Sequence, residues 1–208
     1  MIATLPAGAV LKNRPWRTGI SGTVWEGEVG VAGGSIVRWN WAPLRSLTSL
    51  GFAVDWRATG ENTDLGGRAL FRPGRMVVDK VSGSADATLL RALAPDLPFT
   101  CSMTMQVDLP RVALGGGDQE VEGQVAADPG SCAATGGSPA VPVPALMFTA
   151  TPIGNETRMR LTPMAQRRRE FVTATLAEDG TLRATMTPAG AGALPFAGLP
   201  AGASIRLD

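Results

Sequence analysis

Apolar and polar residues alternate along most of this chain with a period of two, which is typical of β-strands that have one buried face. In residues 35–41, for example, Val37, Trp39 and Trp41 share one face of the predicted strand. Glycine, proline, Gly-Asn and Asp-Gly pairs interrupt the alternation and predict tight turns. The pattern predicts a mainly β fold of curved antiparallel sheet. The expected strands are 18–26, 35–41, 50–56, 67–72, 75–81, 99–109, 146–151, 156–162, 170–177 and 181–187, with a closing strand at 204–207.

Two short segments, 43–47 and 86–93, interrupt the strand pattern and predict helical insertions. The order strand, strand, short helix, strand then appears twice, over 19–57 and 67–109. This order predicts an internal duplication, and a third, degraded copy would begin at 118–125. The alternative is that any protein built from β-hairpins shows such echoes.

The chain is predicted to be one β-rich domain over residues 1–208. Residues 128–145 are rich in proline, glycine, serine and alanine and poor in large apolar side chains, so we expect an exposed loop or a boundary there. The four strands within 146–187 follow as two hairpins, which together make a β-meander.

The chain has 208 residues and a formal net charge of +1, from 19 basic and 18 acidic side chains. A balanced charge predicts no strong field for nucleic acid or anionic lipid. The sequence contains no histidine, so the commonest metal ligand and the usual base of a hydrolase triad are missing. We therefore expect no metal, no cofactor and no nucleic-acid partner.

The two cysteines, Cys101 and Cys132, form either a disulfide or two unrelated buried thiols. Neither lies in a C-x-x-C motif, and no other cysteine or histidine could complete a metal site. No stretch approaches about 18 consecutive apolar residues, so no segment is predicted to span a bilayer.

The best catalytic candidates are two carboxylates, Asp55 and Asp108, at matching strand ends of the two repeats. An acid/base pair needs convergent geometry and shifted pKa values, whereas strand-end aspartates mostly flank turns. We therefore expect no catalytic residues and no hydrolysis of generic substrates.

Three other features suggest sites that simpler explanations account for. The glycines at 115–117 lack the lysine and helix of a phosphate loop, so we expect a turn. The arginines at 167–169 could bind phosphate or acidic lipid, but a solvated hairpin start is favoured. The tryptophans could stack nucleic-acid bases, but packing or an interface is favoured, because few basic residues lie between them. All five are in the first 56 residues: Trp16, Trp25, Trp39, Trp41 and Trp56.

Two segments near the N-terminus together resemble a known family. Residues 19–27 read GISGTVWEG, and residues 37–44 read VRWNWAPL. In this order they resemble the type II secretion system protein N family, whose pattern is SGT(V/L)W-x-G followed by a strand ending in W-x-W/L-x-P. The resemblance is clearest over 5–57 and looser to about residue 130.

The resemblance implies a periplasmic accessory part of a secretion machine, anchored to the inner membrane by an N-terminal helix absent from this chain. It implies partners among the other secretion-system proteins, with a homo-oligomer as a further option. Because the periplasm is oxidising, it also favours the disulfide between Cys101 and Cys132.

The function expected from this resemblance is non-enzymatic assembly through protein–protein contacts. The alternative is a lipid-binding or lipid-transfer β-groove, because a curved sheet with one apolar face suits acyl chains. An accessible apolar trough would favour lipid, whereas a face filled with side chains would favour a scaffold. An enzyme is the least favoured option.

Partner contacts or self-association are expected along an edge strand within 146–187, whose strands are polar and rich in threonine and arginine. A proline at Thr173 should then weaken the complex. The hairpin 18–41 is expected to be a closed, packed end, because its tryptophans favour burial.

Overall fold

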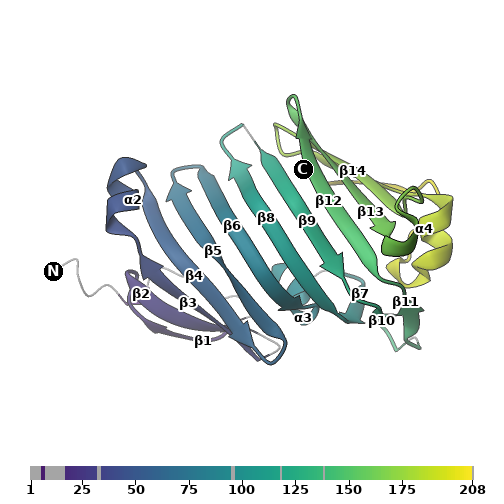
Figure 1. Ribbon diagram of the computed structural model, residues 1–208, viewed down its shortest axis with the longest axis horizontal. Coiled ribbons are helices and arrows are strands. Elements are labelled where there is room, and N and C mark those ends of the chain that lie inside the picture. Colours follow the sequence, from purple (N-terminus) through teal and green to yellow (C-terminus); the bar gives the residue numbers. More distant parts are fainter. Residues whose placement is uncertain are drawn as a thin grey trace.

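A computed structural model describes residues 6–7, 17–31, 34–94, 97–117, 119–137 and 139–207, and it confirms a mainly β fold. Thirteen strands form one antiparallel sheet, and three short strands form a second (Figure 1). The large sheet consists of β1 (Arg17–Gly22), β2 (Glu26–Val31), β3 (Ser35–Trp41), β4 (Phe52–Gly60), β5 (Thr63–Arg72), β6 (Arg75–Asp86), β8 (Thr104–Gly115), β9 (Glu120–Ala127), β12 (Leu146–Ile153), β13 (Glu156–Pro163), β14 (Val172–Ala177), β15 (Leu182–Met186) and β16 (Ser204–Leu207). The small sheet consists of β7 (Phe99–Ser102), β10 (Gly130–Ala134) and β11 (Val141–Val143).

The strands of the large sheet pair in chain order, from β1 at one edge to β16 at the other. The chain leaves this order only to form the small sheet, in which β10 lies between β11 and β7. Because every pair is antiparallel, successive turns alternate between two ends of the large sheet. We call these the α2 end and the α3 end, after the helices found there (Figure 1).

The short helices begin where proline or a capping side chain favours a turn. Helix α2 (Pro43–Thr48) has proline in its first turn and joins β3 to β4. Helix α3 (Thr88–Leu93) follows β6, and the backbone N–H of Thr88 donates to the Asp86 carboxylate at 2.8 Å. Helix α4 (Pro188–Ala193) is capped by Thr187, whose hydroxyl accepts from Gly190 N–H. The 3-10 turns η2 (Met164–Gln166) and η3 (Pro195–Ala197) complete the set.

A line of irregularities crosses the four central strands, and we call it the crease. The register shifts near Gly67 between β5 and β6, and between Asp108 and Arg111 where β8 meets β9. Close to this line, Lys80 has φ +55°, while Gly83 and Gly123 have φ +132° and +135°. Bulges bend strands and increase their twist, so the crease curves the middle of the sheet.

The main core lies at the α3 end, between the large sheet and the elements that cover it there. Met105 and Leu146 from the large sheet, and Phe171 just before β14, pack with the small sheet and with Phe196 of η3. The Phe196 ring meets the Phe99 ring edge-on, with centroids 5.2 Å apart. The expected disulfide between Cys101 and Cys132 is confirmed, and it joins β7 to β10 inside this core.

Several predicted elements are confirmed. The strand at 35–41 has the predicted bounds, and helical segments lie at both predicted places. The four strands of 146–187 are β12 to β15, and β16 closes the series as predicted.

Three predicted segments were wrong in detail. The strand expected over 18–26 is two strands, because Gly22 has φ +89° and turns the chain back on itself. The strand expected over 99–109 breaks at Met103, whose carbonyl accepts from Ala87 N–H as the chain passes from the small sheet to the large one. The loop expected over 128–145 contains β10 and β11, because small residues pair there without needing bulk.

The internal duplication is not confirmed. Helix α2 lies at one end of the large sheet and α3 at the other (Figure 1). The strand after α2 pairs with the strand before it, whereas the strand after α3 joins the small sheet. The third copy, expected at 118–125, contributes β9 to the large sheet, but its first residue lies outside the described part.

Candidate functional site

The large sheet has an inner face that is apolar across almost its whole width. Val54, Val107 and Leu161 lie on this face, because cross-strand partners share a face and neighbours along a strand alternate. The register places Val37, Trp39, Trp56, Leu65, Ala69, Met76, Val78, Val112, Val121, Val125, Phe148, Met159, Val172 and Leu176 on the same face.

The polar residues on the inner face of β3 to β14 are Ser35, Thr63 and Thr157, and all three are buried. The Thr63 hydroxyl accepts from Asp86 N–H, and the Thr157 hydroxyl accepts from Val121 N–H, each at 3.2 Å. These two hydroxyls therefore bond to the backbone, so they are not positioned to bind a polar ligand.

The inner face is covered at the α3 end and less covered at the α2 end. The core lies at the α3 end, where the inner face is covered by the small sheet, α3, α4 and η3. Towards the α2 end, Val112, Val121 and Met159 are only half-buried although they are on the inner face. The inner face is thus filled by side chains over one half and accessible in part over the other.

The outer face carries ion pairs, both between neighbouring strands and along one strand. Arg38 contacts Glu28 at 3.0 Å, and Arg158 contacts Glu156 at 2.9 Å. Arg57 donates two hydrogen bonds of 2.8 Å to Asp64. Those bonds lower the pKa of the Asp64 carboxyl and raise the pKa of the Arg57 guanidinium. Both groups are exposed, so this pair contributes to solubility rather than stability.

The two candidate carboxylates, Asp55 and Asp108, do not come together. Both lie within strands rather than at strand ends, on β4 and β8, with β5 and β6 between them. At about 4.8 Å per strand, three steps separate the two strands by about 14 Å, and the residue across from Asp55 on β8 is Arg111 rather than Asp108. Asp55 instead contacts Arg45 at 2.8 Å and Arg68 at 3.5 Å. The structure therefore offers this pair no shared reacting position.

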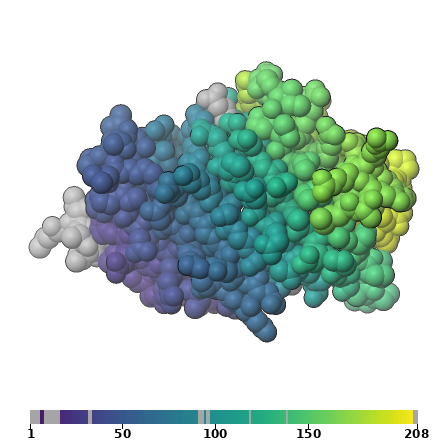
Figure 2. All heavy atoms as spheres, viewed as in Figure 1, coloured from purple at the N-terminus to yellow at the C-terminus, as the bar shows by residue number. Residues whose placement is uncertain are grey.

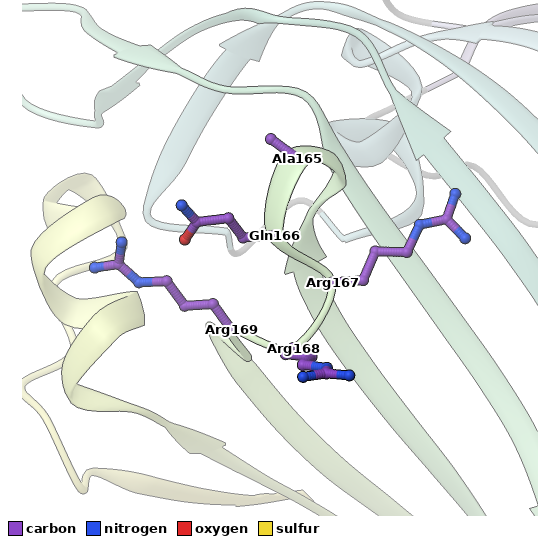
Figure 3. A pocket seen from close by; sticks show the side chains of 5 residues that line it. All are labelled: Ala165, Gln166, Arg167, Arg168 and Arg169. Atoms are coloured by element: carbon purple, nitrogen blue, oxygen red, sulfur yellow. The ribbon is translucent and has the colours of Figure 1, made fainter.

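The arginines at 167–169 lie in an exposed turn after β13, beside a shallow hollow that they line with Ala165 and Gln166. Figure 3 shows the three guanidinium groups pointing in different directions, with Arg169 directed towards α4. The Arg169 guanidinium lies 5.9 Å from the centroid of the Phe171 ring. Because the three groups diverge, they do not form a phosphate site.

The glycines at 115–117 form the turn between β8 and β9, all with φ between +75° and +80°. Within the described residues, no group of three or more acidic or cysteine side chains could hold a metal ion. Among those residues, no helix is both long enough and apolar enough to cross a membrane.

The tryptophans of the described segments lie along the inner face and the turns of β1 to β4. The ring centroids of Trp25 and Trp41 are 4.6 Å apart, and those of Trp25 and Phe52 are 5.9 Å apart. Packing or an interface was predicted for these side chains, and Trp41, which is 39% exposed, is not buried in the core. Trp16 lies outside the described residues.

The sheet edges differ from those expected. Among the described residues, the edge strands are β1 and β16, and β12 to β15 each have a neighbour on both sides. The expected edge within 146–187 was therefore wrong, because β9 covers one side of the meander and β16 the other. Thr173 lies inside the sheet, and the hairpin 18–41 supplies an edge rather than a closed end.

Sequence reasoning missed the exposed leucines of α2 and Leu50, which lies two residues beyond the end of α2. Leu44, Leu47 and Leu50 are 79%, 72% and 87% exposed. A spacing of three residues was visible in the sequence, but so short a segment gave no reason to expect an outward apolar face.

One comparison with known proteins gives a match. The family model described as type II secretion system (T2SS), protein N matches residues 13–191. No curated protein and no solved structure matches the chain.

Proposed function

Because the chain belongs to the type II secretion system protein N family, we propose that it is a non-enzymatic accessory component of that machine. The single observation that carries this proposal is the family match over residues 13–191. We propose a periplasmic location, since the disulfide between Cys101 and Cys132 suits an oxidising compartment. An N-terminal helix in the full-length protein would anchor it to the inner membrane.

We further propose that the protein contacts other secretion-system proteins, or a second copy of itself, through the edges of the large sheet. An edge strand has unpaired backbone groups that can accept a strand from another chain. The candidate edges are β1 and β16.

A cross-linking experiment tests this proposal in cells that carry the secretion system. A photoreactive residue replaces Ser21 on β1 or Ile205 on β16 in the full-length protein, and Thr149 on β12 is the matched internal control. We expect adducts with identified secretion-system proteins, or with a second copy, from the edge positions only. Adducts from Thr149 alone would reject the edges, and a lack of any secretion-system protein among the adducts would reject the assignment.

Lipid binding is a second candidate function, and the apolar inner face favours it. The inner face near the α2 end is only partly covered, as the half-buried Val112, Val121 and Met159 indicate. An acyl chain needs such a surface, because it gains by leaving water and has no polar group to satisfy.

Extraction of the purified protein with organic solvent, followed by mass spectrometry, tests the second candidate. We expect bound lipid in the parent and at least about tenfold less in Val121→Asp, since a charge on the inner face opposes an acyl chain. The matched control is Thr149→Asp, which puts the same charge on the outer face and should leave the lipid content unchanged. A parent protein free of lipid, or equal lipid in both variants, would count against this function.

A further inference from the structure

Five large apolar side chains are exposed together at the α2 end, and we call them the α2 patch. The patch consists of Trp41, Leu44, Leu47, Leu50 and Phe71. Trp41 and Phe71 are 39% and 43% exposed. The leucines are far more exposed than that, and α2 has no buried residue. Figure 1 places α2 at a corner of the molecule, beyond the ends of β3 and β4, and Figure 2 shows the same corner at the surface.

Polar contacts hold the segment that carries the leucines in place. The Ser46 hydroxyl donates to the Ala42 carbonyl and accepts from Ala53 N–H and from the indole N–H of Trp41, each at 2.9 Å. Arg45 donates to the Asp55 carboxylate at 2.8 Å. Arg45 and Ser46 therefore bond back to the sheet, while the leucines of α2 are exposed.

Leu50, two residues beyond the end of α2, adopts an unusual backbone conformation. Leu50 has φ +47°, which is uncommon for a residue other than glycine, asparagine or aspartate. Such conformations persist where the surroundings fix them, and they occur often at functional sites. Here the guanidinium of Arg72 donates to the Ser49 carbonyl, which fixes the chain just before Leu50.

The charges around the patch are basic, although the net charge of the whole chain is only +1. Residues 41–52 and 70–76 include Arg45, Arg72 and Arg75 and no acidic residue; Asp55 beyond them pairs with Arg45, so Arg72 and Arg75 carry the net positive charge. Exposed leucines beside tryptophan and arginine match the chemistry of a lipid interface, where apolar groups enter the acyl region and cations meet anionic head groups.

The described part of the N-terminal segment reaches the sheet beside the same patch. Pro6 forms an antiparallel bridge with Thr23, in the turn between β1 and β2. That turn also holds Trp25, which packs against Trp41. An anchor that precedes Pro6 would therefore bring the chain out of the bilayer at the α2 end.

We propose that the α2 patch docks on the surface of a lipid bilayer that carries anionic head groups. Leu114 and Ile153 are exposed near two other turns of the α2 end, so the bilayer would meet more of this end than one corner. The inner face, which is less covered at this end, would then open towards the membrane. The proposal rests on the proposed function only where it invokes the membrane anchor. The contact between the α2 patch and the bilayer does not depend on that function.

The test measures binding of the 208-residue chain to vesicles of phosphatidylethanolamine and phosphatidylglycerol, by sedimentation and by tryptophan emission. Lipids brominated on the acyl chain serve as quenchers, since Trp25 and Trp41 lie at the patch. We expect the triple variant Leu44→Ser, Leu47→Ser, Leu50→Ser to bind at least about tenfold more weakly, because interfacial binding scales with the apolar area inserted. Bromolipid quenching should fall with it.

The matched control carries Ile36→Ser, Met164→Ser and Ile205→Ser, three exposed apolar residues outside the patch. It should bind as the parent does, and circular dichroism should show the same fold in all three proteins. A parent that does not bind, or a leucine variant that binds equally well, overturns the proposal. If that vesicle-binding leucine variant also loses the cross-links to a partner protein in the cellular experiment above, the patch is a protein interface instead. Because the vesicle test contains no secretion protein, its result does not depend on the secretion assignment.

Discussion

Replacing Gly123 or Gly83 with alanine is expected to lower the free energy of unfolding by about 3 kcal/mol or more. Both glycines lie near the crease with φ above +130°, a region that only glycine adopts readily, and the strain alone costs about 1–3 kcal/mol. A Cβ on Gly123 would lie 2.3 Å from the Asp108 carbonyl oxygen and 2.7 Å from the Leu109 Cα. Because those are backbone atoms of the next strand, they cannot rotate away.

Denaturant unfolding followed by circular dichroism measures this effect. The matched control is Gly154→Ala, in the turn between β12 and β13, where φ is +65° and a Cβ meets no atom within 4 Å. We expect the control to cost only about 1–2 kcal/mol, since it adds backbone strain without a clash. Equal losses at Gly123 and Gly154 would show that the crease does not need its glycines.

Removing the disulfide is expected to destabilise the protein by about 3–4 kcal/mol. Cys101 and Cys132 are separated by 31 positions, and closing a loop of that size restricts the unfolded chain by about this free energy. Such a loss is a large fraction of a typical domain stability of about 5–15 kcal/mol. The disulfide also fixes β7 against β10 in the core at the α3 end, where Cys132 is only 2% exposed.

The measurement compares the parent with Cys101→Ala, Cys132→Ala in denaturant, each with and without reductant. Alanine avoids leaving a hydroxyl unpaired in the core. Reductant should destabilise the parent and leave the double variant unchanged. Identical midpoints for the oxidised parent and the double variant would show that the link contributes nothing, and free thiols in protein from an oxidising compartment would show that it does not form there.

The sequence was sufficient to predict the strands that have one apolar face and one polar face. Val37, Trp39 and Trp41 alternate with polar residues, so β3 was predicted to the residue. The turns at Gly154 and Gly180 likewise separated the strands of the meander. In both places the local pattern and the final packing agree.

The breaks and the edges could not be predicted, because they depend on contacts between distant segments. Met103 lies within an alternating run, and the break there exists only because β7 pairs with β10, whose residues follow β9. Gly123 looks like any strand glycine, and its positive φ belongs to a bend shared with neighbouring strands. The meander was taken for an edge because the pairing of β9 with β12 has no local pattern.

The candidate site was predicted only in part. The alternation indicated an apolar face, and the lack of histidine argued against a catalytic centre, but neither showed which half of the face is covered. The small sheet covers part of the inner face, and two of its strands, β10 and β11, lie in the segment that was predicted to be a loop. The leucines of α2 follow helical spacing, yet only the placement of α2 beyond β3 and β4 leaves them exposed.

The chain order of the large sheet bears on how this protein folds. Each strand can add to the one before it, so the loops to be closed are short and their entropic cost is small. Growth can therefore start at the first hairpins and proceed towards β16 while the rest of the chain is still unfolded. Cys101 and Cys132 flank β8 and β9, so formation of that hairpin brings the two sulfurs together. Oxidation of this pair would then report the moment at which growth of the sheet has passed its midpoint.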